Sequence, residues 1–294
     1  MCFQAPPIFC QRRVSSPLTV TGSVGASNIL AADLGNLAIA AYPTSGTFAT
    51  NGNAGTGRSV TVAGSAFTLT GSARGNYQVS DFTLTGDITR ASLSVNTAGL
   101  SVAARTYDGT RTAAVSGTGT RSGTIYSGDT VTLTQGALTG LYDSADAGSR
   151  TVTVGGFSLS GASAGNYSLA PVQLAATLAQ APLTVQGIYV AAKVYDRTTA
   201  ATLVGSTGTS LATSTVTLGG IVGSDDVRLL NVASQTAAFA DANAATNISV
   251  GLTSAAPLAL TGAAAANYVL TAPVLKGNIT PATLTVTGGI AAQS

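Results

Sequence analysis

The sequence predicts an all-β fold, and three observations support this prediction. Charged residues make up only 8% of the 294 residues, and all eleven acidic residues are Asp, so strong helix formers with charged side chains are scarce. Thr, Val, Ser, Gly and Asn dominate between the Ala residues, a mixture that favours short strands and tight turns. Short apolar or alternating runs recur about every ten residues, separated by Gly, Asp, Asn and Ser.

The chain is a tandem repeat. One phrase, G-A-S-A-G-N-Y-S-L at 161–169, has similar copies at 71–79 (G-S-A-R-G-N-Y-Q-V) and 262–270 (G-A-A-A-A-N-Y-V-L), and the Tyr residues are 90 and 101 residues apart. A second mark, L-[TS]-V at the start of an expected strand, falls at Leu18, Leu93, Leu183 and Leu284. A third mark, a Y-D phrase, lies at 104–115 and 192–203. The marks keep the same order along the chain, which indicates repeated modules.

The spacing of the marks predicts the domain boundaries. We expect an unstructured segment at 1–13, a degenerate or truncated β module at 14–89, two Y-D-containing β modules at 90–179 and 180–280, and the first strand of an incomplete fourth module at 281–294. The third module has its additional residues mainly between Tyr195 and Asp225, which predicts a longer surface loop there.

Each module has the size of a small β domain. About seven short strands in about 90 residues is typical of an immunoglobulin-like sandwich, and a β-grasp-like module fits nearly as well. Consecutive modules are joined without Gly/Ser-rich or Pro-rich spacers, so we expect an elongated array with restricted bending.

The repeated Asn-Tyr pair predicts a structural role. Gly and Asn adopt positive φ easily, so the phrase is expected to reverse the chain before the Tyr opens the next strand. A Tyr at that position can bury its ring while its hydroxyl bonds the loop backbone, as in a tyrosine corner; the alternative is an exposed ladder of Tyr residues that binds sugar rings. These repeat marks are Asn76, Tyr77, Asn166, Tyr167, Asn267 and Tyr268.

The Y-D phrase predicts a turn. Asp-Gly is the dipeptide most typical of a β-hairpin, and Tyr107-Asp108-Gly109 lies between two expected strands. The third module has Tyr195-Asp196 followed by Arg197, so we expect a turn of another type, or a strained one, at that position.

Catalytic and metal-binding patterns are scarce. The absence of His excludes Ser-His-Asp and Cys-His catalysis and zinc sites with imidazole ligands, so we expect no enzymatic activity and no cofactor. Weak candidates for Ca²⁺ ligands are Asp129, Asp143 and Asp146, although they lack a D-x-D-x-D spacing. The net charge of +2 without a basic stripe argues against nucleic acid as a partner. The sequence has no apolar run of about 18 residues, so we expect no insertion into a membrane.

A family resemblance rests on the phrases themselves. R-T-Y-D-G-T-R-T-A-A-V and K-V-Y-D-R-T-T-A-A-T-L, followed by G-A-x-A-G-N-Y-x-L and I-T-P-A-x-L-T-V, resemble the YDG-type repeats in the stalks of filamentous-haemagglutinin-like adhesins. The resemblance covers nearly the whole chain from about residue 14. The resemblance implies a large secreted or surface protein of a Gram-negative bacterium, at the outer membrane, that is exported by a two-partner or similar route. The chain contains no export signal, so we expect it to be a fragment.

Two functions are compatible with these features. The first is a structural stalk segment of an adhesin, whose partners are the adjacent repeats of the parent chain. The second is a direct binding module that contacts host glycans, matrix proteins or neighbouring filaments through exposed loops, such as 205–224, or through edge strands.

Overall fold

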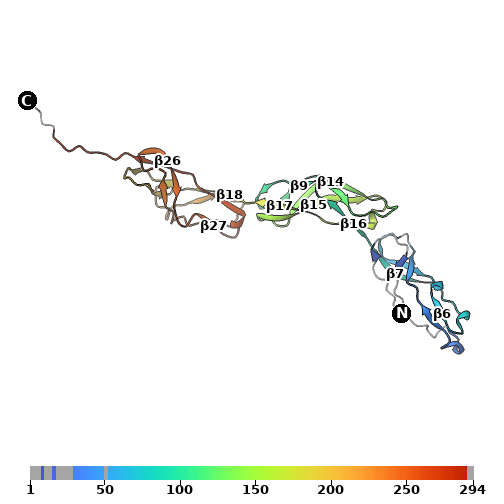
Figure 1. The fold of residues 1–294 in the computed structure, drawn as a ribbon. Helices are drawn as coiled ribbons and strands as arrows, with labels where there is room; N and C mark the ends of the chain where they lie inside the picture. The colour runs from blue at the N-terminus through green and yellow to red at the C-terminus, as the bar shows by residue number, and fades with distance from the viewer. Residues whose placement is uncertain (1–7, 10–14, 18–28, 50–51, 290–294) are drawn as a thin grey trace, which may run out of the picture. The chain divides into compact units, whose positions relative to one another are not determined.

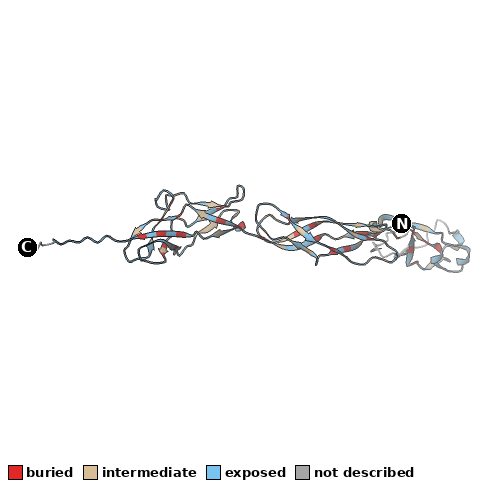
Figure 2. Cartoon of the chain, turned by 90° about the horizontal axis from the view of Figure 1, so that it is seen from above, coloured by how far each residue is buried: buried red, intermediate tan, exposed pale blue. Residues whose placement is uncertain are grey.

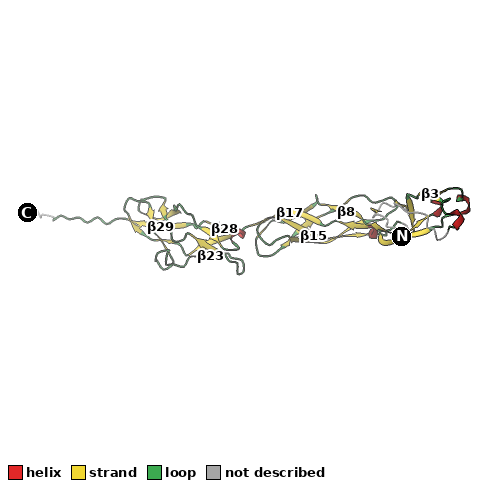
Figure 3. Ribbon diagram, turned by 90° about the horizontal axis from the view of Figure 1, so that it is seen from below, coloured by secondary structure: helices red, strands yellow, loops and turns green. Residues whose placement is uncertain are grey.

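The structure is a computed structural model that describes residues 8–9, 15–17, 29–49 and 52–289 (Figure 1). This part of the chain consists of β-strands and short 3-10 turns, without an α-helix (Figure 3). The chain divides into two compact units. Unit 1 contains residues 1–102, 114–140 and 153–174, and unit 2 contains residues 103–113, 141–152 and 175–294.

A five-stranded sheet occurs three times with the same strand order. In module 1 (residues 8–89) the order is β1 (Ile8–Phe9), β7 (Phe82–Thr89), β5 (Gly55–Val62), β4 (Ser45–Phe48) and β2 (Ser15–Pro17). In module 2 (residues 90–179) it is β10 (Arg105–Thr106), β17 (Val172–Ala179), β15 (Gly148–Ser160), β14 (Thr132–Tyr142) and β11 (Thr112–Ala113). In module 3 (residues 180–280) it is β20 (Lys193–Val194), β29 (Leu275–Thr280), β26 (Ala245–Leu252), β25 (Ala237–Phe239) and β21 (Ala200–Ala201). The first pair is parallel in each module.

Modules 2 and 3 each have a second sheet of three strands. Its central strand carries the L-[ST]-V mark and lies between an antiparallel and a parallel neighbour. The strands are β13 (Thr120–Ser122), β8 (Ala91–Asn96) and β16 (Tyr167–Leu169) in module 2, and β23 (Thr217–Gly219), β18 (Ala181–Gln186) and β28 (Tyr268–Thr271) in module 3.

Four two-stranded ladders complete the described architecture. They are β9 (Leu100–Val102) with β12 (Val115–Gly117), β19 (Tyr189–Val190) with β22 (Leu203–Val204), β24 (Arg228–Leu230) with β27 (Ala259–Thr261), and β3 (Ala38–Ala41) with β6 (Thr68–Thr70). The 3-10 turns are η2 (Ala31–Asp33), η3 (Gly64–Ala66), η4 (Arg74–Asn76), η5 (Ala164–Asn166) and η6 (Ala265–Asn267).

The cores are thin and follow the alternation of the strands (Figure 2). In β18 the residues Ala181 and Leu183 are buried while their neighbours face outward, the pattern of a half-buried strand. Leu183 and its counterpart Leu93 in β8 have exposed fractions of 0% and 1%. The largest core, in module 3, is formed by β25, β26 and β29 together with Leu203 and Leu211. Burying small Val, Ala and Leu side chains in several separate cores accounts for the high apolar content of a chain with few charges.

The expected all-β fold is confirmed and a tandem arrangement of two modules fits the structure, whereas the expected segment 1–13 needs correction. Residues 1–13 were expected to be unstructured, but Ile8–Phe9 form β1, which pairs with β7 as β10 pairs with β17. Module 1 therefore includes residues that precede position 14. The rest of 1–13, with Cys2 and Cys10, and the expected strand at Leu18 lie outside the described residues. Residues 281–289, expected to begin a fourth module, form no strand.

Candidate functional site

The Tyr of each repeated phrase makes the same two hydrogen bonds. Its hydroxyl oxygen accepts a bond from a backbone N–H, and its O–H donates to the carboxylate of an Asp three residues further along. The triplets are Leu30, Asp33 and Tyr77 (3.0 and 2.9 Å), Tyr126, Asp129 and Tyr167 (2.9 and 2.7 Å), and Val222, Asp225 and Tyr268 (2.9 and 2.6 Å). These contacts are those that a tyrosine corner makes, with an added carboxylate.

Sequence reasoning missed this carboxylate. In each module the Asp N–H also donates to the carbonyl oxygen three residues earlier, which closes a β-turn. The turn holds the carboxylate beside the N–H that binds the Tyr hydroxyl. Asp33, Asp129 and Asp225 precede their Tyr by 44, 38 and 43 residues. This loosely constant spacing is the signal in the sequence that points to the carboxylate.

Burial keeps the hydroxyl groups of Tyr107 and Tyr268 in unit 2 protonated. Tyr107 and Tyr268 are 7% and 3% exposed. Burial, followed by the bond to the Asp225 carboxylate, raises the pKa of Tyr107 to about 12 and also raises the pKa of Tyr268. Both hydroxyls are therefore protonated near neutral pH and can donate to the same carboxylate.

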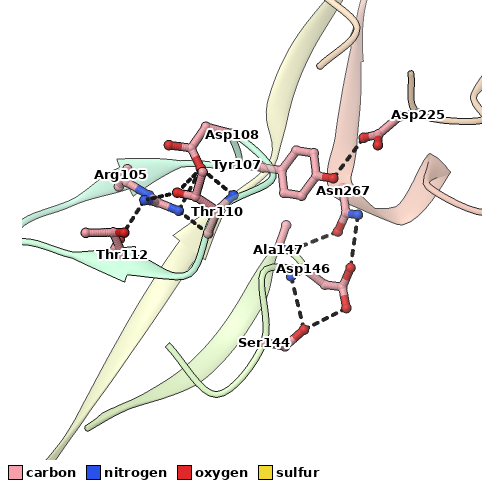
Figure 4. Close-up of polar contacts among 10 residues, drawn as sticks. All are labelled: Arg105, Tyr107, Asp108, Thr110, Thr112, Ser144, Asp146, Ala147, Asp225 and Asn267. Carbon is pink, nitrogen blue, oxygen red and sulfur yellow. Dashed lines mark hydrogen bonds and ion pairs between the residues drawn. The ribbon is translucent and has the colours of Figure 1, made fainter. Parts of the chain in front are cut away.

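The Asn of the repeated phrase contacts a loop of the preceding module. In unit 1, Asn166 of module 2 accepts a bond from the Ala54 N–H of module 1 at 2.9 Å. In unit 2, Asn267 of module 3 accepts one from the Ala147 N–H of module 2 at 2.8 Å, and its amide donates to Asp146 at 3.2 Å (Figure 4). Hydrogen bonds from Ser144 and then Asn267 lower the pKa of Asp146. The Asn of the phrase thus joins consecutive modules rather than only forming a turn.

The Tyr of the Y-D-G phrase belongs to the core of the following module. Tyr107 of module 2 packs against Ala181, Leu183 and Tyr268 of module 3. Its ring meets the ring of Tyr268 edge to face at 5.4 Å. Its O–H donates to Asp225 at 2.8 Å (Figure 4). The junction of modules 2 and 3 therefore contains two Tyr rings that share one carboxylate.

The links between modules are short. Only Arg90 separates β7 from β8, and only Gln180 separates β17 from β18. The Gln180 side chain donates to the Ala266 carbonyl oxygen at 2.9 Å, so this link is itself bonded to module 3. A one-residue link leaves little freedom between adjoining strands.

A cationic side chain fills each Y-D loop. The Arg105 guanidinium donates to the carbonyl oxygens of Thr110 and Thr112 and forms an ion pair with Asp108 at 2.9 Å (Figure 4). Asp108 accepts bonds from both the N–H and the hydroxyl of Thr110. In module 3 the corresponding residues Lys193, Asp196, Thr198 and Ala200 make the same set of contacts.

These bonds also set the charge of the loop. Burial acts to raise the pKa of Asp108, but the Thr110 bonds and Arg105 lower it on balance. The Lys193 bond, followed by the Thr198 bonds, lowers the pKa of Asp196 to about 2. Both carboxylates are ionised at neutral pH. The Thr two positions after the Asp is common to both phrases and is the sequence signal for this pair of bonds.

The loop is not the hairpin that the sequence suggested. Strands β10 and β11, which flank Asp108-Gly109, lie at opposite ends of the five-stranded order instead of pairing with each other. The phrase thus connects the two edges of one sheet. Gly109 has a φ of 78°, and Arg197 at the same position of module 3 has a φ of 68°. Module 3 therefore keeps the turn and places a non-glycine residue in the left-handed region, as the expectation of strain anticipated.

Replacing Arg197 with Gly is expected to stabilise unit 2 by about 0.5–1 kcal/mol. A non-glycine residue in the left-handed region costs about 1–2 kcal/mol, and the greater freedom of Gly in the unfolded chain cancels part of the gain. Urea unfolding followed by circular dichroism measures the change. Gly109→Ala is the converse control and should destabilise by a similar amount; a stabilised Gly109→Ala variant would contradict the interpretation.

Among the described residues no three Cys, Asp or Glu side chains gather in a group that could hold a metal ion. Asp143 bonds the Ser144 N–H, and Asp129 and Asp146 are engaged as described above. A groove of about 710 Å³ beside Tyr77 contains one carboxylate, Asp81, which accepts a bond from the Gly64 N–H. The part of the chain that the structure describes also lacks a helix with the length and apolar character needed to span a membrane.

Comparison with known proteins identifies the repeat. Neither a curated protein nor a solved structure matches the chain. The family model of the YDG domain matches twice, at residues 89–174 and 179–274, which correspond closely to modules 2 and 3. The two matches together cover more than half of the chain, and the chain therefore belongs to the YDG domain family.

Proposed function

We propose that the chain is a structural repeat segment from the stalk of a secreted or surface-exposed bacterial adhesin of the filamentous-haemagglutinin-like type, without catalytic activity. One observation carries this proposal: residues from both repeated phrases join consecutive modules. Asn166 and Asn267 bind the loop of the preceding module, and Tyr107 enters the core of the following one.

A stalk must bear force and hold its distal end in place, which requires junctions between modules that bend little. The one-residue links at Arg90 and Gln180 restrict bending. The junction in unit 2 adds an aromatic pair, two hydroxyl bonds to Asp225 and the Asn267 bonds. Buried, fully paired polar groups of this kind stabilise one arrangement, because any other arrangement leaves them unpaired. The recurring side chains thus support a firm connection between consecutive modules.

For the fold of each module we propose a small sandwich of the immunoglobulin-like kind. The core of module 3 combines side chains of the five-stranded sheet with Val185 of β18 and Val190 of β19. The alternative, a β-grasp module, packs a helix on its sheet. An α-helix is missing from the described residues, and this favours the sandwich.

A direct binding role is the second candidate, and the loop at 205–216 is its best support. Leu211 is buried in the core of module 3, which anchors this loop. The hydroxyls of Thr207, Thr209 and Ser214 are bonded to one another at the surface. A fixed row of hydroxyl groups suits glycans, since it can both donate and accept hydrogen bonds.

Surface labelling and binding assays together separate the two candidates. Antibodies against residues 90–280 should label intact cells of the bacterium that encodes the chain, and labelling only after lysis would contradict the proposal. The purified chain should show no saturable binding to host cells or to a panel of glycans. Saturable binding that Thr207→Ala with Thr209→Ala abolishes, and that Ser101→Ala leaves unchanged, would favour the direct binder.

A further inference from the structure

The tyrosine corners of modules 2 and 3 are built from residues at matching positions. Each corner packs a Leu of the central strand, a Val two residues after the corner Asp, and the Tyr of the repeated phrase. These residues are Leu93, Val131 and Tyr167 in module 2, and Leu183, Val227 and Tyr268 in module 3. All six are less than 9% exposed. The two corners can therefore be compared position by position.

The corners differ in where the aromatic neighbour of the Tyr comes from. In module 2 the ring of Tyr126 stacks on that of Tyr167, with centroids 6.4 Å apart, and both residues belong to the same module. In module 3 the ring that meets Tyr268 belongs to Tyr107 of the preceding module. Position 222 of module 3 corresponds to position 126, because the N–H of each donates to the corner hydroxyl. This position is Tyr in module 2 and Val in module 3.

Val222 lies against the Y-D-G loop of module 2. A Cβ atom added to Gly109 would lie 3.4 Å from Val222 Cγ1, which is van der Waals contact. Gly109 follows Tyr107 by two residues, so the side chain at position 222 faces the loop that brings Tyr107 into the cluster. Val222 is a partly buried member of the same cluster. A much larger side chain at position 222 would need space that the loop occupies.

We propose that the residue at position 222 selects the neighbour that the corner of module 3 accepts. Val222 leaves room for a Y-D-G loop, and the corner therefore receives Tyr107 and Gly109 of the preceding module. A Tyr at this position, as at 126, supplies an aromatic neighbour from within the module and excludes the loop by its size. Specificity of this kind rests on a clash with one neighbour as much as on contacts with another.

Asp225 adds a chemical requirement to this steric one. Its carboxylate accepts bonds from Tyr107 and Tyr268 at 2.8 and 2.6 Å (Figure 4). An incoming ring without a hydroxyl would leave part of this half-buried carboxylate unpaired. The partner that fits the corner is therefore a loop with a Tyr and, two residues later, a Gly. The inference rests on the proposed function, in which modules join in series, and names the partner that one junction selects.

Nitration of Tyr rings in the folded 294-residue chain tests the proposal. Tetranitromethane modifies accessible Tyr rings, and trypsin releases Tyr107 in the peptide 106–111, which contains no other Tyr. Tyr107 is 7% exposed and should react slowly, whereas Tyr189 is 53% exposed and serves as the reference within the same chain. In the Val222→Tyr variant, nitration of Tyr107, measured by mass spectrometry, should rise several-fold towards that of Tyr189.

Two further variants separate bulk from lost contact. Val222→Ala removes the contact with the loop without adding bulk, so Tyr107 should stay as protected as in the original chain. Val222→Leu adds less bulk than Tyr and should raise the nitration of Tyr107 by a smaller factor. Circular dichroism verifies the fold of each variant, and Val222→Leu keeps the proposal testable if Val222→Tyr does not fold.

The outcomes are distinct from those of surface labelling. Protection of Tyr107 in every folded variant would overturn the proposal, and so would equal exposure of Tyr107 in the Ala variant and in the larger variants. Labelling of cells only after lysis would contradict the stalk and leave the selection at position 222 intact. Labelling of intact cells, with Tyr107 protected in all variants, would support the stalk and remove the selection.

Discussion

Replacing Tyr268 with Ala is expected to lower the free energy of unfolding of unit 2 by about 3–5 kcal/mol, the range for truncating a large buried aromatic side chain. Tyr268 is 3% exposed and packs against Tyr107, Leu183 and Val227. Its hydroxyl also binds the Val222 N–H and the Asp225 carboxylate. The substitution therefore creates a cavity and removes the partner of a loop N–H at the same time.

A matched variant separates the ring from the hydroxyl. Tyr268→Phe keeps the ring and leaves Tyr107 bonded to Asp225, so it should cost only about 1–2 kcal/mol, from the unpaired Val222 N–H. Denaturant titration of the full chain, followed by circular dichroism and Tyr fluorescence, gives both values. An Ala variant that unfolds at the same denaturant concentration as the original chain would show that the ring does not hold the core.

The all-β fold could be predicted from the sequence because each repeated phrase contains its own turn chemistry. The Asn-Tyr phrase is local: Gly and Asn reverse the chain, and Tyr opens the strand. Composition and the order of the marks were then enough to predict an all-β array. The same reasoning could not find the partners of the phrase. Asp225 lies 43 residues before Tyr268, and Ala147 lies 120 residues before Asn267. Contacts at this separation depend on sheet topology, which spacing within a phrase does not specify.

Topology also explains the two errors. Asp108-Gly109 reads as a hairpin because the flanking runs look like adjacent strands, but β10 pairs in parallel with the far end of β17, and β11 lies at the other edge of the sheet. Similarly, I-F at residues 8–9 has no likeness to R-T at 105–106. Only the pairing of β1 with the end of β7 shows that these residues occupy the same place. Short edge strands are held by main-chain bonds and therefore carry little sequence signal.

Replacing Gly161 with Ala is expected to destabilise unit 1 by more than about 2 kcal/mol. Gly161 has a φ of 105°, a conformation that costs other residues about 1–3 kcal/mol. An added Cβ would also lie 2.5 Å from the Thr130 carbonyl oxygen, a backbone atom that accepts the Ser163 N–H and cannot move without breaking the turn. The strain and the collision add to each other, so the total exceeds the ordinary cost of a Gly→Ala change at positive φ.

The same phrase contains the control. Gly165 lies four residues further along, outside the left-handed region, and an added Cβ there meets nothing within 4 Å. Gly165→Ala should therefore be neutral or stabilise slightly, since it lowers the entropy of the unfolded chain. The first Gly of the phrase has the same close approach in modules 1 and 3, where Gly71 faces Asn36 and Gly262 faces Asp226. If the two variants unfold at the same denaturant concentration, the positive φ of Gly161 does not determine the turn. The same would then hold for the first Gly of the other two phrases.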